Sequence, residues 1–298
     1  SSGINPDSKF RHLGETSHGV PIEINELALD ADRLILTGGI IYHLLAGFGA
    51  GRKAVLPGIS SYQTIQRNHC LCLRDEIGTG IKPEIVSGNL KTNLMHQDQM
   101  EHGAAADADF LVNVVANTHG QPAQFVCGHW EKAWLEGTKL VEKIYGVPIN
   151  GLADCVIASS GGYPKDINLY QGVKTQDNAV KAVKPGGVVI LVMELEDIHE
   201  PAEFIGWFDT KDLHEREVKL RAGFTVPGFI ALHLGEDFKR YKHILVTKPE
   251  NKELCDNIGV DVVTSVDEAL QRATELLGRD DFTVNVMPLA SNTMPIVK

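Results

Sequence analysis

The sequence predicts an α/β protein composed of two α/β domains with mostly parallel sheets. Hydrophobic residues make up 43% of the 298 residues, which is enough for two cores. Segments typical of strands and of helices alternate along most of the chain, and parallel strands require such crossover segments. Neither a repeat nor a linker rich in proline or serine interrupts this alternation. We place the domain boundary near Val147, giving domains 1–146 and 147–298.

The first half contains four segments typical of strands and three typical of helices. Residues 20–25 alternate apolar and polar side chains, which favours a strand. The other strands are predicted at 31–39, 107–117 and 125–130, and the helices at 60–75, 92–107 and 131–146. Residues 40–49 are apolar, but their glycines favour a loop over a helix.

The second half continues the same pattern. Strands are predicted at 152–162, 184–195, 243–249 and 282–288, and helices at 167–183 and 266–280. The last helix is clearly amphipathic, with apolar residues at 269, 270, 273, 276 and 277. We expect residues 201–241 to continue the alternation, and we leave open that the extreme C-terminus crosses back to the first domain.

Composition limits the classes of partner. The formal net charge is -11 and the pI is about 5.5, which argues against nucleic acid as a partner because phosphate-binding surfaces are basic. Five cysteines without a Cys-x-x-Cys pair argue against a disulfide framework and indicate a reducing compartment. No apolar run reaches the roughly 20 residues that span a bilayer, and no leader is visible at Ser1. We therefore expect a cytoplasmic protein without membrane partners.

The most informative segment is HLLAGFGAGRKAVLPGI, residues 43–59. Its glycines allow close approach of a ligand to the backbone, and we expect Gly49 and Gly51 to offer bare N–H groups to an anion. Arg52 and Lys53 add two cations, and Lys53 is a candidate phosphate clamp or covalent anchor. The segment differs from the usual phosphate loop, because Arg52 precedes the lysine and an alanine follows it.

Two histidines flank this segment. His43 has a side chain that can exchange a proton near neutral pH, and His69 lies on the helix predicted at 60–75, where a neutral ring nitrogen can bind a metal. A single buried histidine is more often structural, but the neighbouring Lys53 favours a functional interpretation of both.

A second candidate segment is SSGGYPKDINLYQGVK, residues 159–174. Gln171 and Lys174 are three residues apart on a predicted helix and so share a face, which suits a small carboxylate. Tyr170 is a weaker candidate. Ordinary surface residues at a helix start would give the same spacing, so the spacing alone does not decide between the two interpretations.

The two long motifs, together with GETSHGVPIEIN and DADFLVNVVAN, resemble the nickel-dependent lactate racemase family over nearly the whole chain. The resemblance implies two α/β domains, the first cofactor-binding and the second substrate-binding, with an active-site cleft between them. It implies racemisation or epimerisation of a small 2-hydroxy acid by proton-coupled hydride transfer. The cofactor of the family is a nickel-pincer nucleotide, which maturation enzymes supply.

By motif position, Lys53 matches the lysine to which this cofactor is covalently attached, and His69, sixteen residues later, matches the nickel ligand. Gly49, Gly51 and Arg52 are expected beside the cofactor. His43 matches one of two catalytic histidines, and Gln171 and Lys174 match residues that engage the substrate.

The sequence departs from the family in two ways. In the family, the second catalytic histidine, with an arginine and an aspartate of the cofactor site, precedes the position that matches Ser1, so the first domain is expected to lack its first part. Trp134 stands where we expect a histidine in relatives, which would reshape the pocket.

Two alternatives stay open at the level of sequence. The first is a non-catalytic protein on the same scaffold that binds a nucleotide or another anion through the glycine-rich turn with Arg52 and Lys53. The second is a nicotinamide dehydrogenase, which is disfavoured because no Gly-x-Gly-x-x-Gly follows a first strand.

Overall fold

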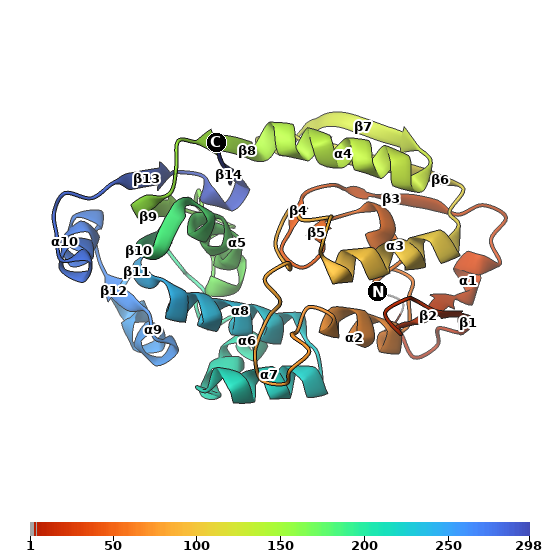
Figure 1. The fold of residues 1–298 in the computed structure, drawn as a ribbon, viewed down its shortest axis with the longest axis horizontal. Helices are drawn as coiled ribbons and strands as arrows, with labels where there is room; N and C mark the ends of the chain where they lie inside the picture. The colour runs from red at the N-terminus through yellow and green to blue at the C-terminus, as the bar shows by residue number, and fades with distance from the viewer. Residues whose placement is uncertain (1–2, 4) are drawn as a thin grey trace. The chain divides into compact units, whose positions relative to one another are not determined.

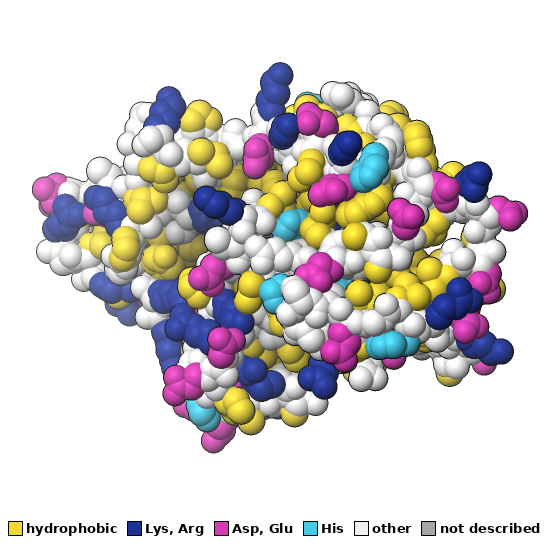
Figure 2. Space-filling view, turned by 45° about the vertical axis from the view of Figure 1, so that its right-hand side comes forward, with side chains coloured by type: hydrophobic (Ala, Val, Ile, Leu, Met, Phe, Trp, Pro, Cys, Tyr) yellow, Lys and Arg dark blue, Asp and Glu magenta, His cyan; other side chains and the backbone are white. Residues whose placement is uncertain are grey.

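The computed structural model describes residue 3 and residues 5–298, and these form two compact units, 1–144 and 145–298 (Figure 1). Each unit is described by itself. The face shown in Figure 2 carries Lys and Arg side chains interspersed with Asp and Glu side chains, with apolar surface between them. None of the helices in the described part of the chain combines the length and the apolar composition that a bilayer crossing requires.

The first unit is organised around a three-stranded sheet of order β3-β6-β7. Strands β3 (Ile35–Gly39) and β6 (Phe110–Ala116) are parallel, and β7 (Pro122–Gly128) is antiparallel to β6. Along β6, Leu111, Asn113 and Val115 are buried and alternate with more exposed residues, so one face of the sheet contributes to the core. Helix α3 (Leu94–Ala106) precedes β6 in the chain, and helix α4 (Trp130–Tyr145) follows β7 (Figure 1).

Smaller elements complete the first unit. Strands β1 (Phe10–Glu15) and β2 (Pro21–Asn25) form an antiparallel pair, followed by the short helix α1 (Glu26–Leu29). Helix α2 (Tyr62–Cys70) begins at the N-cap Ser61, whose hydroxyl accepts a hydrogen bond of 3.1 Å from Thr64 N. Helix α3 begins in the same way at Asn93, which accepts from His96 N at 3.1 Å. These caps explain where the two helices start.

The second unit contains a five-stranded parallel sheet of order β12-β11-β10-β9-β13. The strands are β9 (Ala153–Ser159), β10 (Val183–Val192), β11 (Lys242–Val246), β12 (Asp261–Val263) and β13 (Val284–Met287). Its core includes Val188, Ile190 and Ile244, all fully buried, with Ala269 and Ala273 of α10 (Val266–Leu277) packed in the same cluster. β-Branched residues buried on central strands are typical of a parallel sheet.

Helices connect these strands. They are α5 (Leu169–Ala179), α6 (Ala202–Gly206), α7 (Leu213–Ala222), α8 (Val226–Arg240) and α9 (Lys252–Ile258). Short 3-10 turns occur at Val180–Ala182, Trp207–Asp209, Pro249–Asn251 and Ala290–Asn292. A separate parallel pair joins β8 (Gly146–Ile149) to β14 (Met294–Val297) near the C-terminus.

The predicted fold class is confirmed, since both units are α/β and most strand pairs of the larger sheet are parallel. The expected alternation is wrong over 201–241, where three helices, α6, α7 and α8, follow one another with a 3-10 turn. The sequence also did not predict that β7 is antiparallel to β6. Side chains alternate in the same way along parallel and antiparallel strands, so the sequence pattern does not distinguish the two directions.

We expect Ile190→Ala to lower the free energy of unfolding by about 2–5 kcal/mol, because it leaves a cavity in the core of the second unit. Ile296→Ala is the matched control: Ile296 is 48% exposed on β14, and we expect its loss to cost about 1 kcal/mol or less. Urea unfolding of both variants measures the difference, and equal costs would contradict this description of the core.

Candidate active site around Lys53 and His69

The glycine-rich segment folds as a small hairpin that leads into a 3-10 turn. Strands β4 (Tyr42–His43) and β5 (Gly47–Phe48) pair in antiparallel fashion, and the turn η1 (Gly51–Ala54) follows. Ala50 has a φ of 56° and Gly51 a φ of 55°, so two successive residues lie in the region that disfavours side chains. This backbone geometry reverses the chain before Lys53.

Trp134 explains why residue 51 is a glycine. A Cβ at Gly51 would lie 2.5 Å from the indole of Trp134, closer than van der Waals contact allows. The indole Nε1 donates a hydrogen bond of 2.9 Å to the carbonyl of Gly49. Trp134 is fully buried on α4 and packs against the glycine-rich segment, while its effect on a pocket stays a prediction.

The side chain of Arg52 binds the backbone of the glycine-rich segment. Its guanidinium donates to the carbonyls of Phe48, at 2.9 Å, and Ala46, at 2.5 Å, and lies 4.1 Å from the centroid of the Trp134 ring. The residue is fully buried, and burial lowers the pKa of Arg52 to about 9. Its predicted role beside a cofactor stays a prediction, while these contacts support a structural role.

The prediction that the backbone N–H groups of Gly49 and Gly51 have no partner within the protein is wrong. Gly49 N donates to Ile41 O at 2.8 Å, and Gly51 N donates to the side-chain oxygen of Asn113 at 3.0 Å. The sequence could not reveal this, because the acceptors come from residues outside the motif. Contact of Gly49 and Gly51 with a cofactor therefore remains a prediction that rests on the resemblance.

Lys53 lies within the turn η1, and its side chain is half-buried. Burial, and secondly the charge of Arg52, lower the pKa of Lys53 to about 8. A substantial fraction of the amine is therefore neutral at mildly alkaline pH. A neutral amine is the nucleophilic form of lysine, as a covalent anchor requires.

His69 lies on α2 with only 5% of its surface exposed. Burial lowers the pKa of His69 to about 4, and the charge of Lys53 contributes to this shift, so the two side chains are electrostatic neighbours. The ring Nδ1 lies 2.7 Å from Ile65 O, which can only accept, so Nδ1 carries the proton. A neutral imidazole with its Nδ1–H on a backbone carbonyl has its lone pair at Nε2, the form in which histidine binds metals.

His43 is half-buried at the end of β4. Its Nδ1 accepts hydrogen bonds from Leu45 N, at 3.2 Å, and Ala46 N, at 3.3 Å. These bonds place the proton of a neutral ring at Nε2, so in this conformation His43 offers a hydrogen-bond donor there. Accepting a proton at Nε2 requires the ring to release the two backbone N–H groups.

The second candidate segment opens α5 in the other unit. Asn168 caps the helix by accepting a hydrogen bond of 2.9 Å from Gln171 N. The side chain of Gln171 is half-buried, and that of Lys174 is exposed. The pKa of Lys165 is lowered by burial and then by the charge of Lys174, so these lysines are neighbours. Sequence spacing missed Lys165, because it precedes the helix and shares no periodicity with Lys174.

The side chain of Tyr170 packs against another aromatic ring of the second unit. Its ring makes an edge contact with Phe204 at a centroid distance of 5.6 Å. Burial, and then the charge of Glu203, raise the pKa of the Tyr170 phenol. This supports its ranking below Gln171 and Lys174.

Within the first unit, the structure brings together Arg52, Lys53 and His69. Across residue 3 and residues 5–298, no group of three His, Cys, Asp or Glu side chains could hold a metal ion. His69 fits a metal whose remaining donors come from a cofactor, and Lys53 fits a covalent attachment.

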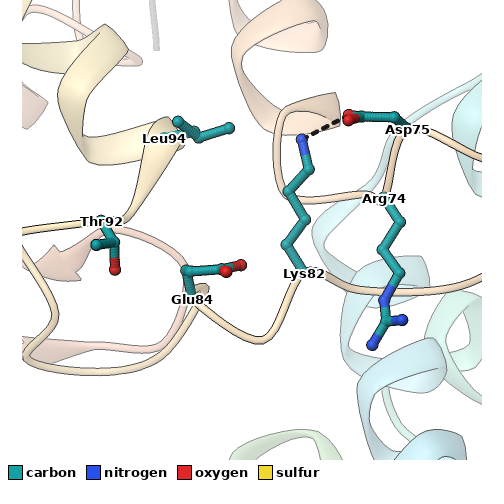
Figure 3. A pocket seen from close by; sticks show the side chains of 6 residues that line it. All are labelled: Arg74, Asp75, Lys82, Glu84, Thr92 and Leu94. Atoms are coloured by element: carbon teal, nitrogen blue, oxygen red, sulfur yellow. Dashed lines mark ion pairs between the residues drawn. The ribbon is translucent and has the colours of Figure 1, made fainter.

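A separate pocket of about 380 Å³ lies in the first unit and is lined by both signs of charge (Figure 3). Within it, Lys82 forms an ion pair of 2.9 Å with Asp75. Its lining residues are Arg74, Asp75, Lys82, Glu84, Thr92 and Leu94. None of these is a predicted site residue.

The structure is that of a two-unit α/β protein in which a desolvated amine, Lys53, and a neutral imidazole, His69, are electrostatic neighbours. Comparisons with known proteins identify the family. Residues 3–80 match the lactate racemase N-terminal domain, and residues 150–292 match the lactate racemase C-terminal domain.

Two curated relatives match over most of the chain. The lactate racemase of Thermoanaerobacterium thermosaccharolyticum is 35% identical over 282 residues, which is 93% of this chain and 64% of the relative. The lactate racemase of Lactiplantibacillus plantarum is 31% identical over 273 residues, 90% of this chain and 62% of the relative. The chain thus spans less than two thirds of the length of these curated relatives.

Solved structures agree with this result. The lactate racemase apoprotein from Thermoanaerobacterium thermosaccharolyticum superposes with a TM-score of 0.86 at 33% identity, covering 97% of this chain and 68% of that one. A protein from Thermotoga maritima shares the fold, with a TM-score of 0.64 at 16% identity over 99% of this chain and 77% of its own. The chain belongs to the lactate racemase family.

Gly51→Ala tests the packing of the glycine-rich segment. We expect the new methyl group to clash with Trp134 and to cost about 1–3 kcal/mol more than Gly19→Ala. Gly19 is the matched control because it also has a positive φ, 72°, but a Cβ placed there would have no atom within 4 Å. Urea unfolding reports both costs, and the absence of a difference would argue against the Trp134 contact.

Lys53 should react with an acylating reagent along a titration curve centred near pH 8 instead of near its ordinary pKa of 10.5. Quantitative mass spectrometry of the Lys53 peptide measures this, with Lys53→Arg identifying the signal. Because the folded pKa lies below the unfolded one, the unfolded chain binds more protons between these pH values. Lys53 should therefore make folding more favourable as pH rises through that window. A midpoint near 10.5 would show an ordinary solvated amine.

Proposed function

We propose that the protein is a racemase of a small 2-hydroxy acid, with lactate as the first substrate to test. The observation that carries the proposal is the pair of Lys53 and His69, an amine with a pKa near 8 beside an imidazole kept neutral by burial. Membership in the lactate racemase family supports the same chemistry.

A nickel-pincer nucleotide fits these residues. Lys53 would hold it covalently through Nζ, and His69 would donate the Nε2 lone pair to nickel, which accepts nitrogen and sulfur donors. When bound, this group would accept and return a hydride at the substrate carbon. Maturation enzymes are the partners that this requirement implies.

The other candidate residues act on the substrate in this proposal. His43 binds the substrate hydroxyl at Nε2 and exchanges its proton when the ring leaves the N–H groups of Leu45 and Ala46. In the second unit, the Lys174 ammonium and the Gln171 amide hold the carboxylate, and the neighbouring charge of Lys165 favours an anion there. The first unit would thus bind the cofactor, and the second the substrate.

The alternative of a non-catalytic anion-binding protein depended on the glycine-rich turn, Arg52 and Lys53, and most of these donors bind acceptors within the unit. The N–H groups of Gly49 and Gly51 and the guanidinium of Arg52 donate to acceptors inside the unit. No observation favours this alternative over the racemase.

The test is co-expression with the family's maturation enzymes, followed by peptide mass spectrometry, metal analysis and measurement of lactate racemisation. We expect an adduct on Lys53 and about one nickel per chain. Lys53→Ala should lose the adduct, and His69→Ala should retain it with much less nickel. Lys82→Ala, at a lysine outside the site, should match the wild type. An unmodified, metal-free protein would overturn the proposal.

His43→Ala separates catalysis from cofactor loading. We expect it to keep the adduct and the nickel while racemisation falls at least about 100-fold, because general acid–base catalysis typically contributes that much. A chiral assay of D- and L-lactate measures the change. Full racemase activity in His43→Ala would remove His43 from the proposed mechanism.

A further inference from the structure

Helix α2, which carries His69, is held in the first unit by a row of buried polar side chains. Ser61, Thr64 and Asn68 are three and four residues apart and therefore share one side of the helix. Ser61 Oγ donates to Glu23 Oε2 at 2.5 Å, and Thr64 Oγ1 donates to Pro21 O at 2.7 Å. Both acceptors belong to β2, so hydrogen bonds fix the start of α2 to that strand.

Asn68 attaches the end of α2 to α3. Its Nδ2 donates to Asp98 Oδ2 at 2.7 Å and to Met95 O at 3.2 Å. Asn68 is fully buried and directly precedes His69. The contact is therefore made one residue from the proposed nickel ligand.

Asp98 is the point at which three segments meet. The carboxylate is fully buried, and its second oxygen accepts from Thr16 Oγ1 at 2.5 Å. Thr16 lies in the GETSHG segment and itself accepts from Val20 N at 3.2 Å. His102 Nδ1 is hydrogen-bonded to the backbone carbonyl of Asp98, at 2.9 Å, and lies 3.5 Å from Oδ2. Burial raises the pKa of Asp98, while the hydrogen bonds from Thr16 and Asn68 favour its ionised form, in which it is an acceptor.

We propose that Asp98 is a positioning residue for His69, acting through Asn68. This inference rests on the proposed role of His69 as the nickel ligand. The imidazole of His69 is fixed to its own helix by the bond from Nδ1 to Ile65 O. The bonds of Ser61 and Thr64 hold the start of that helix, and the bond from Asn68 to Asp98 holds its end, next to His69. A hydrogen bond is directional where an apolar contact tolerates rotation, so the bond to Asp98 contributes to where His69 Nε2 points.

The test exchanges the two partners. Asp98→Asn places an amide donor opposite the Asn68 donor, and Asn68→Asp places two carboxylates together. The double variant, Asp98→Asn with Asn68→Asp, restores one donor and one acceptor with their direction reversed, but it does not restore the bond to Met95 O, so we expect partial recovery. Thr16 can still donate to the side-chain oxygen of an asparagine at 98. Val141→Ala, at a buried residue of α4, is the control for general loss of stability.

Two readouts are needed, and one does not depend on the cofactor. In the apoprotein, the ring ¹⁵N and ¹H NMR signals of His69 should shift or broaden in each single variant and return toward wild type in the double variant. In the loaded protein, each single variant should lose nickel to a chelator about 10–100-fold faster at unchanged Lys53 modification, as for other residues that orient metal ligands. Val141→Ala should change neither readout.

Wild-type NMR signals and nickel retention in both single variants would overturn the proposal. So would a double variant that recovers neither. If wild type and His69→Ala retain nickel equally, the proposed role of His69 as ligand fails, while the apoprotein NMR signals still decide whether Asp98 positions the ring. If Asp98→Asn does not fold, Asn68→Ala replaces it, with the same shift of the His69 signals expected and an unchanged spectrum counting against the proposal.

Discussion

The buried guanidinium of Arg52 is the interaction on which the candidate site of the first unit depends. It binds two carbonyls of the hairpin and stacks on Trp134, so it joins β5, the 3-10 turn and α4. Its burial without an ion-pair partner among the described residues explains the lowered pKa, and its charge in turn lowers the pKa of Lys53. One buried cation thus adds, after burial itself, to the neutral fraction of the neighbouring amine.

Much of the fold could be predicted from periodicity and caps. Helix α10 follows from its apolar stripe, and β10 from its β-branched run. The failure over 201–241 has a physical cause. Segments such as FTVPGFIALHLG are apolar enough for a buried strand. The start of the helix is marked by the N-cap Thr225, which accepts from Gly228 N, and by Pro227 in the first turn. A helix cap depends on one polar side chain at the helix start, so an analysis of the pattern of apolar residues does not detect it.

For the site, the sequence pointed to Lys53 and His69 but could not reveal the hydrogen-bond partners of their surroundings. Arg52 and the glycine N–H groups resemble anion donors as long as their acceptors are unknown. Arg52 donates to nearby backbone carbonyls, and Gly51 N donates to Asn113, which is far away in sequence. Lys165 and Asp98 went unnoticed for a similar reason. Their significance comes from neighbours that only the folded chain brings close, Lys174 in one case and Asn68 in the other.

The contact between Gly51 and Trp134 has an evolutionary consequence. Since no side chain fits at 51 while an indole occupies that space, the two positions cannot drift independently. A homologue with a smaller residue at the position of Trp134 has room for a Cβ at 51, although the positive φ there still favours glycine, whereas one that keeps the tryptophan must keep the glycine. The homologue without the tryptophan would also need another donor for the carbonyl of residue 49. Covariation between these two columns in an alignment would record that dependence.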